Sequence, residues 1–431
     1  MKKSLLLLLG FLLTSVNLFS QTTTADPVFG VKFSGFVRSD IFFDTRQTVA
    51  AREGAFLLWP ERPRFDINGD DVNQKTNFNM LAILTRFTAT ISGPDAFGAK
   101  TSGVVEADFF GQANDNISLV RLRHAFAKLT WTNADLMIGQ YWNPLFISDA
   151  YPTTASINSG TPFNSFARNP QIRLTQKAGH FTFIGAALSQ RDFASYASNG
   201  GASAAASSST WLRNSSIPDL HFQIHFNKKS ESGTAFLAGA GIAYKTIVPR
   251  LSAPTIPGPA FIEVNEKISG LTTIAFAKLT TPAITLKAQF RYAENLTDVL
   301  TPGGYGVTGT TTPGGEELTY SPITINSYWA EIHTNGSKVQ VGFFAGLLTN
   351  NGTIDELSGT TNTVYGNSMD FARMVRFSPR VAFISNKLKF SFETEYSMTE
   401  WGDGTYDINA LPLNTTEVSN IRLLFTSVYT F

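Results

Sequence analysis

Hydrophobic and polar residues alternate with period two along most of this chain, which is the pattern of β-strands with two different faces. In the segment 282–294, for example, Lys287, Gln289 and Arg291 share one face and an apolar series occupies the other. The pattern predicts sixteen strands, at residues 31–44, 78–92, 101–110, 119–131, 134–143, 170–178, 180–189, 219–227, 234–246, 267–279, 282–294, 324–334, 337–349, 371–385, 387–400 and 416–431. The chain is therefore expected to be all-β.

The connections between these segments alternate in length. Long loops are predicted at 45–77, 144–169, 190–218, 247–266, 295–323, 350–370 and 401–415, with a shorter one at 111–118. They alternate with short turns at 94–100, 132–133, 178–179, 227–233, 280–281, 335–337 and 386. Short turns on one rim and long loops on the other are typical of a transmembrane β-barrel, whose closed sheet leaves no strand edge unpaired in lipid. We therefore predict a 16-stranded antiparallel transmembrane β-barrel over residues 21–431, with long extracellular loops and short periplasmic turns.

The two strand faces indicate which side meets lipid. Charge on a lipid-facing position near the bilayer midplane costs about 2–4 kcal/mol, so the charged face is expected to line the lumen. Sixteen strands enclose a lumen wide enough for an aqueous channel. The third loop on the long-loop rim, Pro144–Asn169, follows the loops 45–77 and 111–118 and contains three prolines that stiffen it. We expect it to fold into the lumen and narrow the channel.

Composition places the chain outside the cytoplasm and excludes several kinds of chemistry. Lys2 and Lys3 precede the apolar run Leu5–Leu13, which predicts a signal peptide over residues 1–20, cleaved after Ser20. The absence of cysteine excludes disulfides, thiolate metal sites and cysteine nucleophiles. Without the two N-terminal lysines the 34 basic residues become 32 against 33 acidic ones, so no nucleic-acid partner is expected.

The end of the chain and three internal segments resemble known families. The last strand alternates and stops on Phe431, which resembles the C-terminal signature of bacterial outer-membrane proteins. The strand number and the third loop resemble the sixteen-stranded trimeric bacterial porins. Within these, Val120–Phe126, Gly139–Trp142 and Arg168–Arg173 are similar to the DcaP-like porins. The resemblance implies a homotrimer in the outer membrane of a Gram-negative bacterium, passing small anionic solutes that include dicarboxylates.

Charged residues on the inward strand faces are the candidate functional residues. By register, the following are predicted to line the pore: Arg38, Arg86, Glu106, Asp108, Arg121, Arg123, Arg173, Arg291, Arg376, Arg380 and Arg422. Rings of Arg and Lys select anions in pores, so the predicted function is passive diffusion of small hydrophilic solutes with a modest preference for anions. The alternative is a wide lumen whose solvated charges give no selectivity.

Three outward positions are candidates for contacts between subunits. The first strand presents Gly35 and Ser39 outward, and parity with Arg121 and Arg123 places His124 outward as well. Small and polar residues allow close packing between protomers, so Gly35, Ser39 and His124 are predicted to lie in the trimer interface. An outward His also keeps open a phospholipase-like outer-membrane hydrolase, and a saturable, substrate-specific uptake channel is a further alternative. No cofactor is expected for the favoured function.

Two motifs could suggest other ligands. Gly304–Gly309 matches a dinucleotide fingerprint, but that motif requires a preceding strand and a following helix. Asp66–Asp71 could offer oxygen ligands to Ca²⁺, although it lacks the frame of a helical calcium loop. Turn formation is the favoured interpretation of the second motif, because Asp, Asn and Gly promote turns.

Overall fold

The computed structural model describes residues 29–431, apart from 199–204, 256–257, 259, 313 and 359–362. The predicted signal peptide at 1–20 lies outside the described residues. The wall strands are β1 (Gly30–Asp44), β4 (Asn77–Leu81) with β5 (Arg86–Ala96), β6 (Ala99–Asp108), β7 (Arg121–Thr130), β8 (Ala134–Trp142), β9 (Arg168–Ala178), β10 (Phe181–Leu188), β13 (Asp219–Lys229), β14 (Ala235–Ile247), β17 (Ile268–Thr280), β18 (Ile284–Glu294), β20 (Leu318–Thr334), β21 (Val339–Thr353), β23 (Phe371–Ser385), β24 (Leu388–Trp401) and β25 (Thr416–Thr430).

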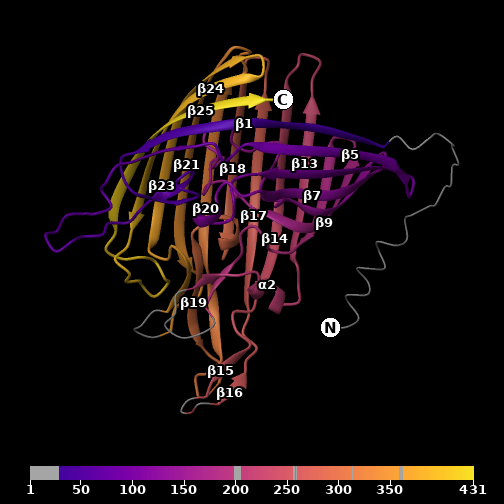
Figure 1. The fold of residues 1–431 in the computed structure, drawn as a ribbon. Helices are drawn as coiled ribbons and strands as arrows, with labels where there is room; N and C mark the ends of the chain where they lie inside the picture. The colour runs from indigo at the N-terminus through magenta and orange to yellow at the C-terminus, as the bar shows by residue number, and fades with distance from the viewer. Residues whose placement is uncertain (1–28, 199–204, 256–257, 259, 313, 359–362) are drawn as a thin grey trace.

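These strands form a closed antiparallel barrel, as predicted (Figure 1). The seam is the pairing of β1 with β25, which runs from Phe36 opposite Thr430 to Asp44 opposite Arg422. The predicted strand 78–92 is interrupted, because the chain leaves the ladder between β4 and β5, and both pieces pair with β1. Counting β4 and β5 as one wall strand gives the sixteen strands predicted over the described residues.

The two rims differ as the loop lengths predicted. One rim carries short turns, such as Gly179–His180 and Asn386–Lys387, where Gly179 and Asn386 adopt positive φ. The other rim carries the long connections, which contain β2 (Thr48–Ala51), β3 (Phe56–Pro60), β11 (Tyr196–Ala197), β12 (Ala206–Ser207), β15 (Ser252–Pro254), β16 (Phe261–Glu263), β19 (Gly303–Thr310), β22 (Val364–Asn367), the helix α2 (Thr210–Asn214) and the 3₁₀ turns η1 (Asn114–Asn116) and η2 (Thr297–Val299). In outer-membrane barrels the short-turn rim is periplasmic.

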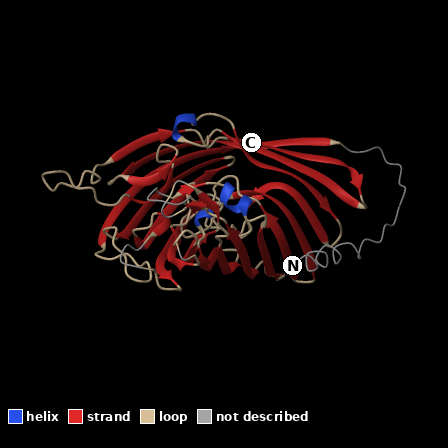
Figure 2. Ribbon diagram, turned by 90° about the horizontal axis from the view of Figure 1, so that it is seen from below, coloured by secondary structure: helices blue, strands red, loops and turns tan. Residues whose placement is uncertain are grey.

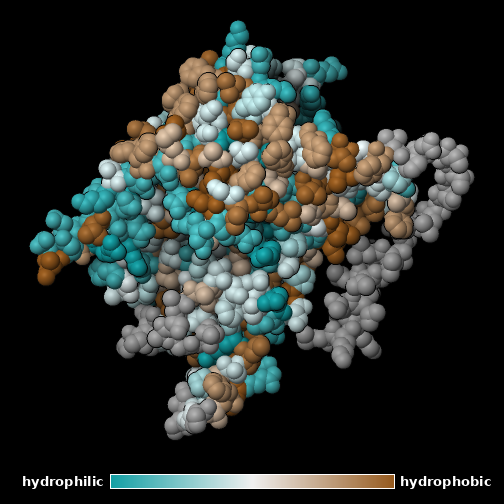
Figure 3. All heavy atoms as spheres, viewed as in Figure 1, coloured by the Kyte–Doolittle hydropathy of each residue, from teal (hydrophilic) through white to brown (hydrophobic). Residues whose placement is uncertain are grey.

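The outer face of the wall is apolar across the strands. Space-filling spheres show brown residues gathered over the strands and teal residues over the loops at the lower left (Figure 3). Exposed aromatic and aliphatic residues include Phe222, Ile224, Phe290, Tyr328, Phe377 and Phe390. An apolar outer band around a closed barrel is the surface that lipid chains cover. Among the described residues there is no helix both long and apolar enough to cross a bilayer.

A β-bulge between β6 and β7 corrects one prediction. Glu106 pairs with His124, but Ala107 pairs with Leu122, so one extra residue stands in β7. A bulge reverses the alternation on its strand, because two residues then oppose one. Arg123 and His124 consequently both lie inside the barrel, 1% and 5% exposed. The predicted outward direction of His124 was wrong for this reason.

The lumen is filled far more than expected. Figure 2, seen from the long-loop end, shows loops occupying the middle of the barrel. The first loop, residues 45–76, sends Phe56, Leu58 and Trp59 inward, where they pack with Phe146, Phe163 and Phe166 of the third loop. Wall side chains complete this apolar core: Trp329, Phe344, Leu348, Phe371, Met374 and Trp401. Any solute path must therefore run beside a protein core and cannot follow an open axis.

Candidate functional site

The third loop, residues 143–167 between β8 and β9, folds into the lumen as predicted; we call it the constriction loop. Two carboxylates of the opposite wall accept hydrogen bonds from its backbone. Glu393 accepts from the N–H groups of Ala155 and Ser156 at 2.8 and 2.9 Å, and Glu331 accepts from the N–H of Thr153 at 3.0 Å. Charge-assisted bonds of this kind are the stronger ones, so the loop is fixed across the barrel.

Two buried arginines hold the same loop from other strands. Arg291 donates to the carbonyl of Pro162 at 3.2 Å, and Arg376 donates to that of Thr161 at 2.7 Å. Arg376 also donates to Leu58 O of the first loop at 2.6 Å. Arg291 and Arg376 were predicted to line the pore. Instead they are fully buried, and they anchor loops to the wall.

A second group of predicted pore residues forms a paired cluster on β6 and β7. Arg121 makes two hydrogen bonds to Asp108, at 3.0 and 2.9 Å, and Arg123 bridges Asp108 and Glu106 at 3.0 and 2.7 Å. Asp108 is fully buried and Arg121 is 5% exposed. Both carboxylates are thus neutralised by their own arginines.

Of the remaining arginines that were predicted to line the pore, some stabilise the barrel wall and others border open space in the lumen. Arg422 is buried, stacks over Phe42 and pairs with Asp44 at 2.6 Å across the seam. Arg173 donates to Gln171 Oε1 and lies over the ring of Tyr141. These two therefore stabilise the wall rather than line the open space described next.

A cavity of about 360 Å³ lies between the constriction loop and the wall made by β1, β5, β7 and β8. Its charged lining residues are Arg38, Arg86, Arg123 and Lys389, and no described carboxylate lines it. Aromatic rings also line it, Phe36 and Trp142 from the wall and Phe146, Tyr151 and Phe166 from the constriction loop. Sequence reasoning missed Lys389, although it lies on the same strand face as Ser391 and Glu393.

The cavity lining is positive because the nearby carboxylates are bound within the protein and do not border the cavity. Asp40 pairs with Arg38 at 2.7 Å, and Glu106 lies 3.7 Å from Arg86. Glu393 is bound by the loop backbone. Three of the four cations are partners of these acids, but the cations border the cavity and the carboxylates do not. Opposite the cations stands the apolar core, and a low-dielectric wall strengthens the field of nearby charges.

A smaller cavity of about 150 Å³ adjoins the first. It is lined by Arg380, His333, Gln340 and Ser391 among others, and it shares Thr153 and Lys389 with the larger cavity. Four of the residues predicted to line the pore therefore border open space, namely Arg38, Arg86, Arg123 and Arg380.

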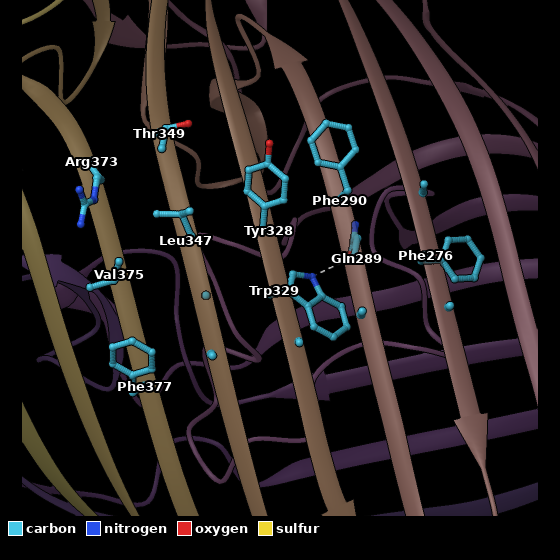
Figure 4. A pocket seen from close by; sticks show the side chains of 16 residues that line it. Phe276, Gln289, Phe290, Tyr328, Trp329, Leu347, Thr349, Arg373, Val375 and Phe377 are labelled. Atoms are coloured by element: carbon cyan, nitrogen blue, oxygen red, sulfur yellow. Dashed lines mark hydrogen bonds between the residues drawn. The ribbon is translucent and has the colours of Figure 1, made fainter.

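A hollow of about 920 Å³ belongs to the outer surface (Figure 4). Strand register pairs Ala277 with Ala288, Ala288 with Ala330, and Ala330 with Ala345, so small side chains form its floor. Outward Phe290, Tyr328 and Phe377 border it. Lipid chains would fill a groove on this face, so it is not part of the solute path.

The predicted interface residues take different positions. Ser39 is exposed on the outer face. The ring of Phe431 already covers Gly35, where an added Cβ would stand 2.8 Å from the ring and 2.1 Å from the carbonyl oxygen of Arg86. His124 lies inside, 3.6 Å from Glu106 and beside the rings of Tyr141 and Trp142. His124 is therefore removed from the predicted interface, and the feature that suggested a hydrolase is removed with it.

The two ligand motifs form local structure. Asp66 accepts hydrogen bonds from the backbone N–H groups of Asn68 and Asp70, and the bond from Asp70 is the main cause of its lowered pKa. Asp71 pairs with Arg46 at 2.7 Å. These contacts support the turn interpretation. Gly304 and Gly306 lie on β19, which pairs with β20 and β22, and the next element that the structure describes after it is the strand β20.

The closed sheet, the apolar outer face and the charged interior define a β-barrel of the outer-membrane type. No protein-family model matches the sequence, and no curated protein matches it either. Solved structures do match. The outer membrane channel DcaP of Acinetobacter baumannii is 15% identical, with a TM-score of 0.66 over 96% of this chain and 99% of that chain.

Two further structures share the architecture. OmpT, an outer membrane protein of Vibrio cholerae, is 11% identical with a TM-score of 0.52, covering 96% of this chain and 100% of that one. An anion-selective porin from Comamonas acidovorans is 10% identical with a TM-score of 0.51, covering 94% and 100%. At these identities the likeness establishes the fold. This chain has the fold of the bacterial outer-membrane porins.

Proposed function

We propose that this protein is a porin of the Gram-negative outer membrane. It lets small hydrophilic solutes diffuse passively down their gradients, with a modest preference for anions such as dicarboxylates, and it assembles as a homotrimer. The observation that carries the proposal is the larger cavity, whose charged lining consists of Arg38, Arg86, Arg123 and Lys389.

The physical basis is that cations border the cavity, whereas the lumen carboxylates are bound to other groups of the protein. Glu393 is bound by the constriction loop, and Glu331 is bound by that loop and by Lys287 and Arg380, so both offer little attraction to a passing cation. The cavity cations meet an anion in a narrow space beside an apolar core, where screening by water is reduced. Basic linings of this kind favour anions. The solved anion-selective porin of the same fold is consistent with the proposal.

The test is the reversal potential of the purified protein in a planar bilayer under a KCl gradient. A potential of the sign given by chloride permeation is expected, and it should shrink as salt approaches 1 M, where the screening length falls to about 3 Å. A potential of cation sign would contradict the selectivity. Absence of conductance from a correctly folded, heat-modifiable barrel would contradict the channel itself.

A further inference from the structure

Lys389 is a cation of the solute path without a partner among the described residues. It is the second residue of β24, directly after the short turn Asn386–Lys387, and its neighbours on the same inward face are Ser391 and Glu393. Its ammonium group makes no hydrogen bond or ion pair with any residue that the structure describes. It stands at the junction of the two cavities, because it lines both.

The charged groups around Lys389 are bound to other partners, Arg38 and Arg380 to carboxylates and Glu393 to backbone N–H groups of the constriction loop. Register places Val428 opposite Lys389 and Arg38 opposite Val428, so Arg38 lies two strands away, about 10 Å at the usual strand spacing. Arg38 pairs with Asp40, and Arg380 pairs with Glu331. Arg38, Arg380 and Glu393 are the charged groups close enough to affect Lys389. Among the described charged residues that line the smaller cavity, Lys389 is the one without an ion-pair partner, since Arg380 and His333 both contact Glu331.

The same cavity offers neutral hydrogen-bonding groups. Gln340, Ser391 and His333 line it beside Lys389. A side-chain amide and a hydroxyl can each donate to an oxyanion, and the ammonium supplies up to three donors. The volume of about 150 Å³ fits a small oxyanion and excludes a bulky solute.

We propose that Lys389, with Gln340 and Ser391, forms an oxyanion subsite at the periplasmic end of the path. It takes the phosphate or carboxylate group of a solute that leaves the larger cavity, and it gives the channel a saturable component. This inference rests on the proposed anion-conducting function. Binding there must be weak enough for release, as conduction requires.

The first test measures block of the chloride current by inorganic phosphate. Lys389→Gln should raise the half-blocking phosphate concentration about tenfold, which corresponds to about 1.4 kcal/mol at 25 °C. Lys389→Arg should keep the block, because it keeps the charge. Lys387→Gln is the matched control, since it removes the same charge from the exposed turn two residues away and should change the value less than twofold.

The absence of cysteine from the chain permits a second test. In Ser391→Cys, which keeps Lys389, the only thiol should react with a water-soluble cationic thiosulfonate, and phosphate should slow that reaction at least threefold. In Lys387→Cys phosphate should leave the rate unchanged.

Equal block in the Lys389→Gln and Lys387→Gln channels, or labelling at position 391 that phosphate does not slow, would overturn the subsite. If the unmodified channel still has a reversal potential of anion sign, the proposed function survives that result. A cation-sign potential of the unmodified channel would instead mark failure of the proposed function.

Discussion

Replacing Arg376 by Met should loosen both loops that fill the lumen. Its guanidinium donates to Thr161 O at 2.7 Å, to Leu58 O at 2.6 Å and to Ser397 Oγ at 2.8 Å, so one side chain ties β23 to the constriction loop and the first loop. Methionine has similar reach and fills the space flexibly, but it donates no hydrogen bond. The wall ladder does not involve the side chain and should remain intact.

The size of the effect follows from the two loop contacts. Hydrogen bonds to a charged group contribute about 1.5–3 kcal/mol each, so the pair contributes at most about 3–6 kcal/mol. The lower value would raise the population of channels with a displaced loop about a hundredfold, since 1.4 kcal/mol is a factor of ten. Because Glu331 and Glu393 still hold the loop elsewhere, the displacement should be transient.

The assay is single-channel recording combined with limited proteolysis. Arg376→Met should show brief events of higher conductance and new cleavage within residues 143–167. Arg373→Met is the control, because it lies three residues away on the outer face, with its side chain 47% exposed and its charge 3.5 Å from Glu400. An Arg376→Met channel with the conductance, noise and cleavage pattern of the unmodified protein would refute the reasoning.

Three other predictions follow from the described contacts. Arg86→Gln with Arg123→Gln should move the reversal potential toward cations at low salt, whereas unchanged selectivity would show that these two cavity residues do not control permeation. Deleting the middle of the constriction loop should raise single-channel conductance in a barrel that still migrates as folded, and an unchanged conductance would place the narrowest point elsewhere. Cysteine at Ser39 should give disulfide-linked subunits and cysteine at Phe390 should not, because Ser39 is predicted to lie in the trimer interface and Phe390 belongs to the apolar outer face; the opposite result would put the interface on the other side.

The strand number and both rims could be predicted from the sequence because each depends on local patterns. Period-two alternation identifies a strand with one apolar face, and turn residues such as Gly179 and Asn386 identify the short connections. The inward course of the third loop was also predictable from its length and position. These features need no knowledge of which strand contacts which loop.

The errors arise where an inserted residue or a distant partner decides the outcome. The bulge opposite Glu106 reverses the face of His124, and its local sign is the break in alternation at the consecutive polar residues Arg123 and His124. The inward packing of the first loop had a signal, the consecutive apolar residues Phe56–Trp59 in a polar segment. Which arginines reach the cavity depends on where carboxylates such as Asp108 find partners, and that is a property of the closed barrel.

The barrel wall and the apolar loop core inside it should respond differently to heat. The wall is held by backbone hydrogen bonds around a closed ring, whereas the loops are held largely by packing of side chains such as Trp59, Phe163 and Trp401. Exposure of apolar surface raises the heat capacity, so melting of the interior should have its own calorimetric signature. Amides of the loop core would then exchange with solvent by sub-global opening while the ring stays closed. On warming, the loop core inside the barrel should therefore lose its packing before the barrel wall unfolds.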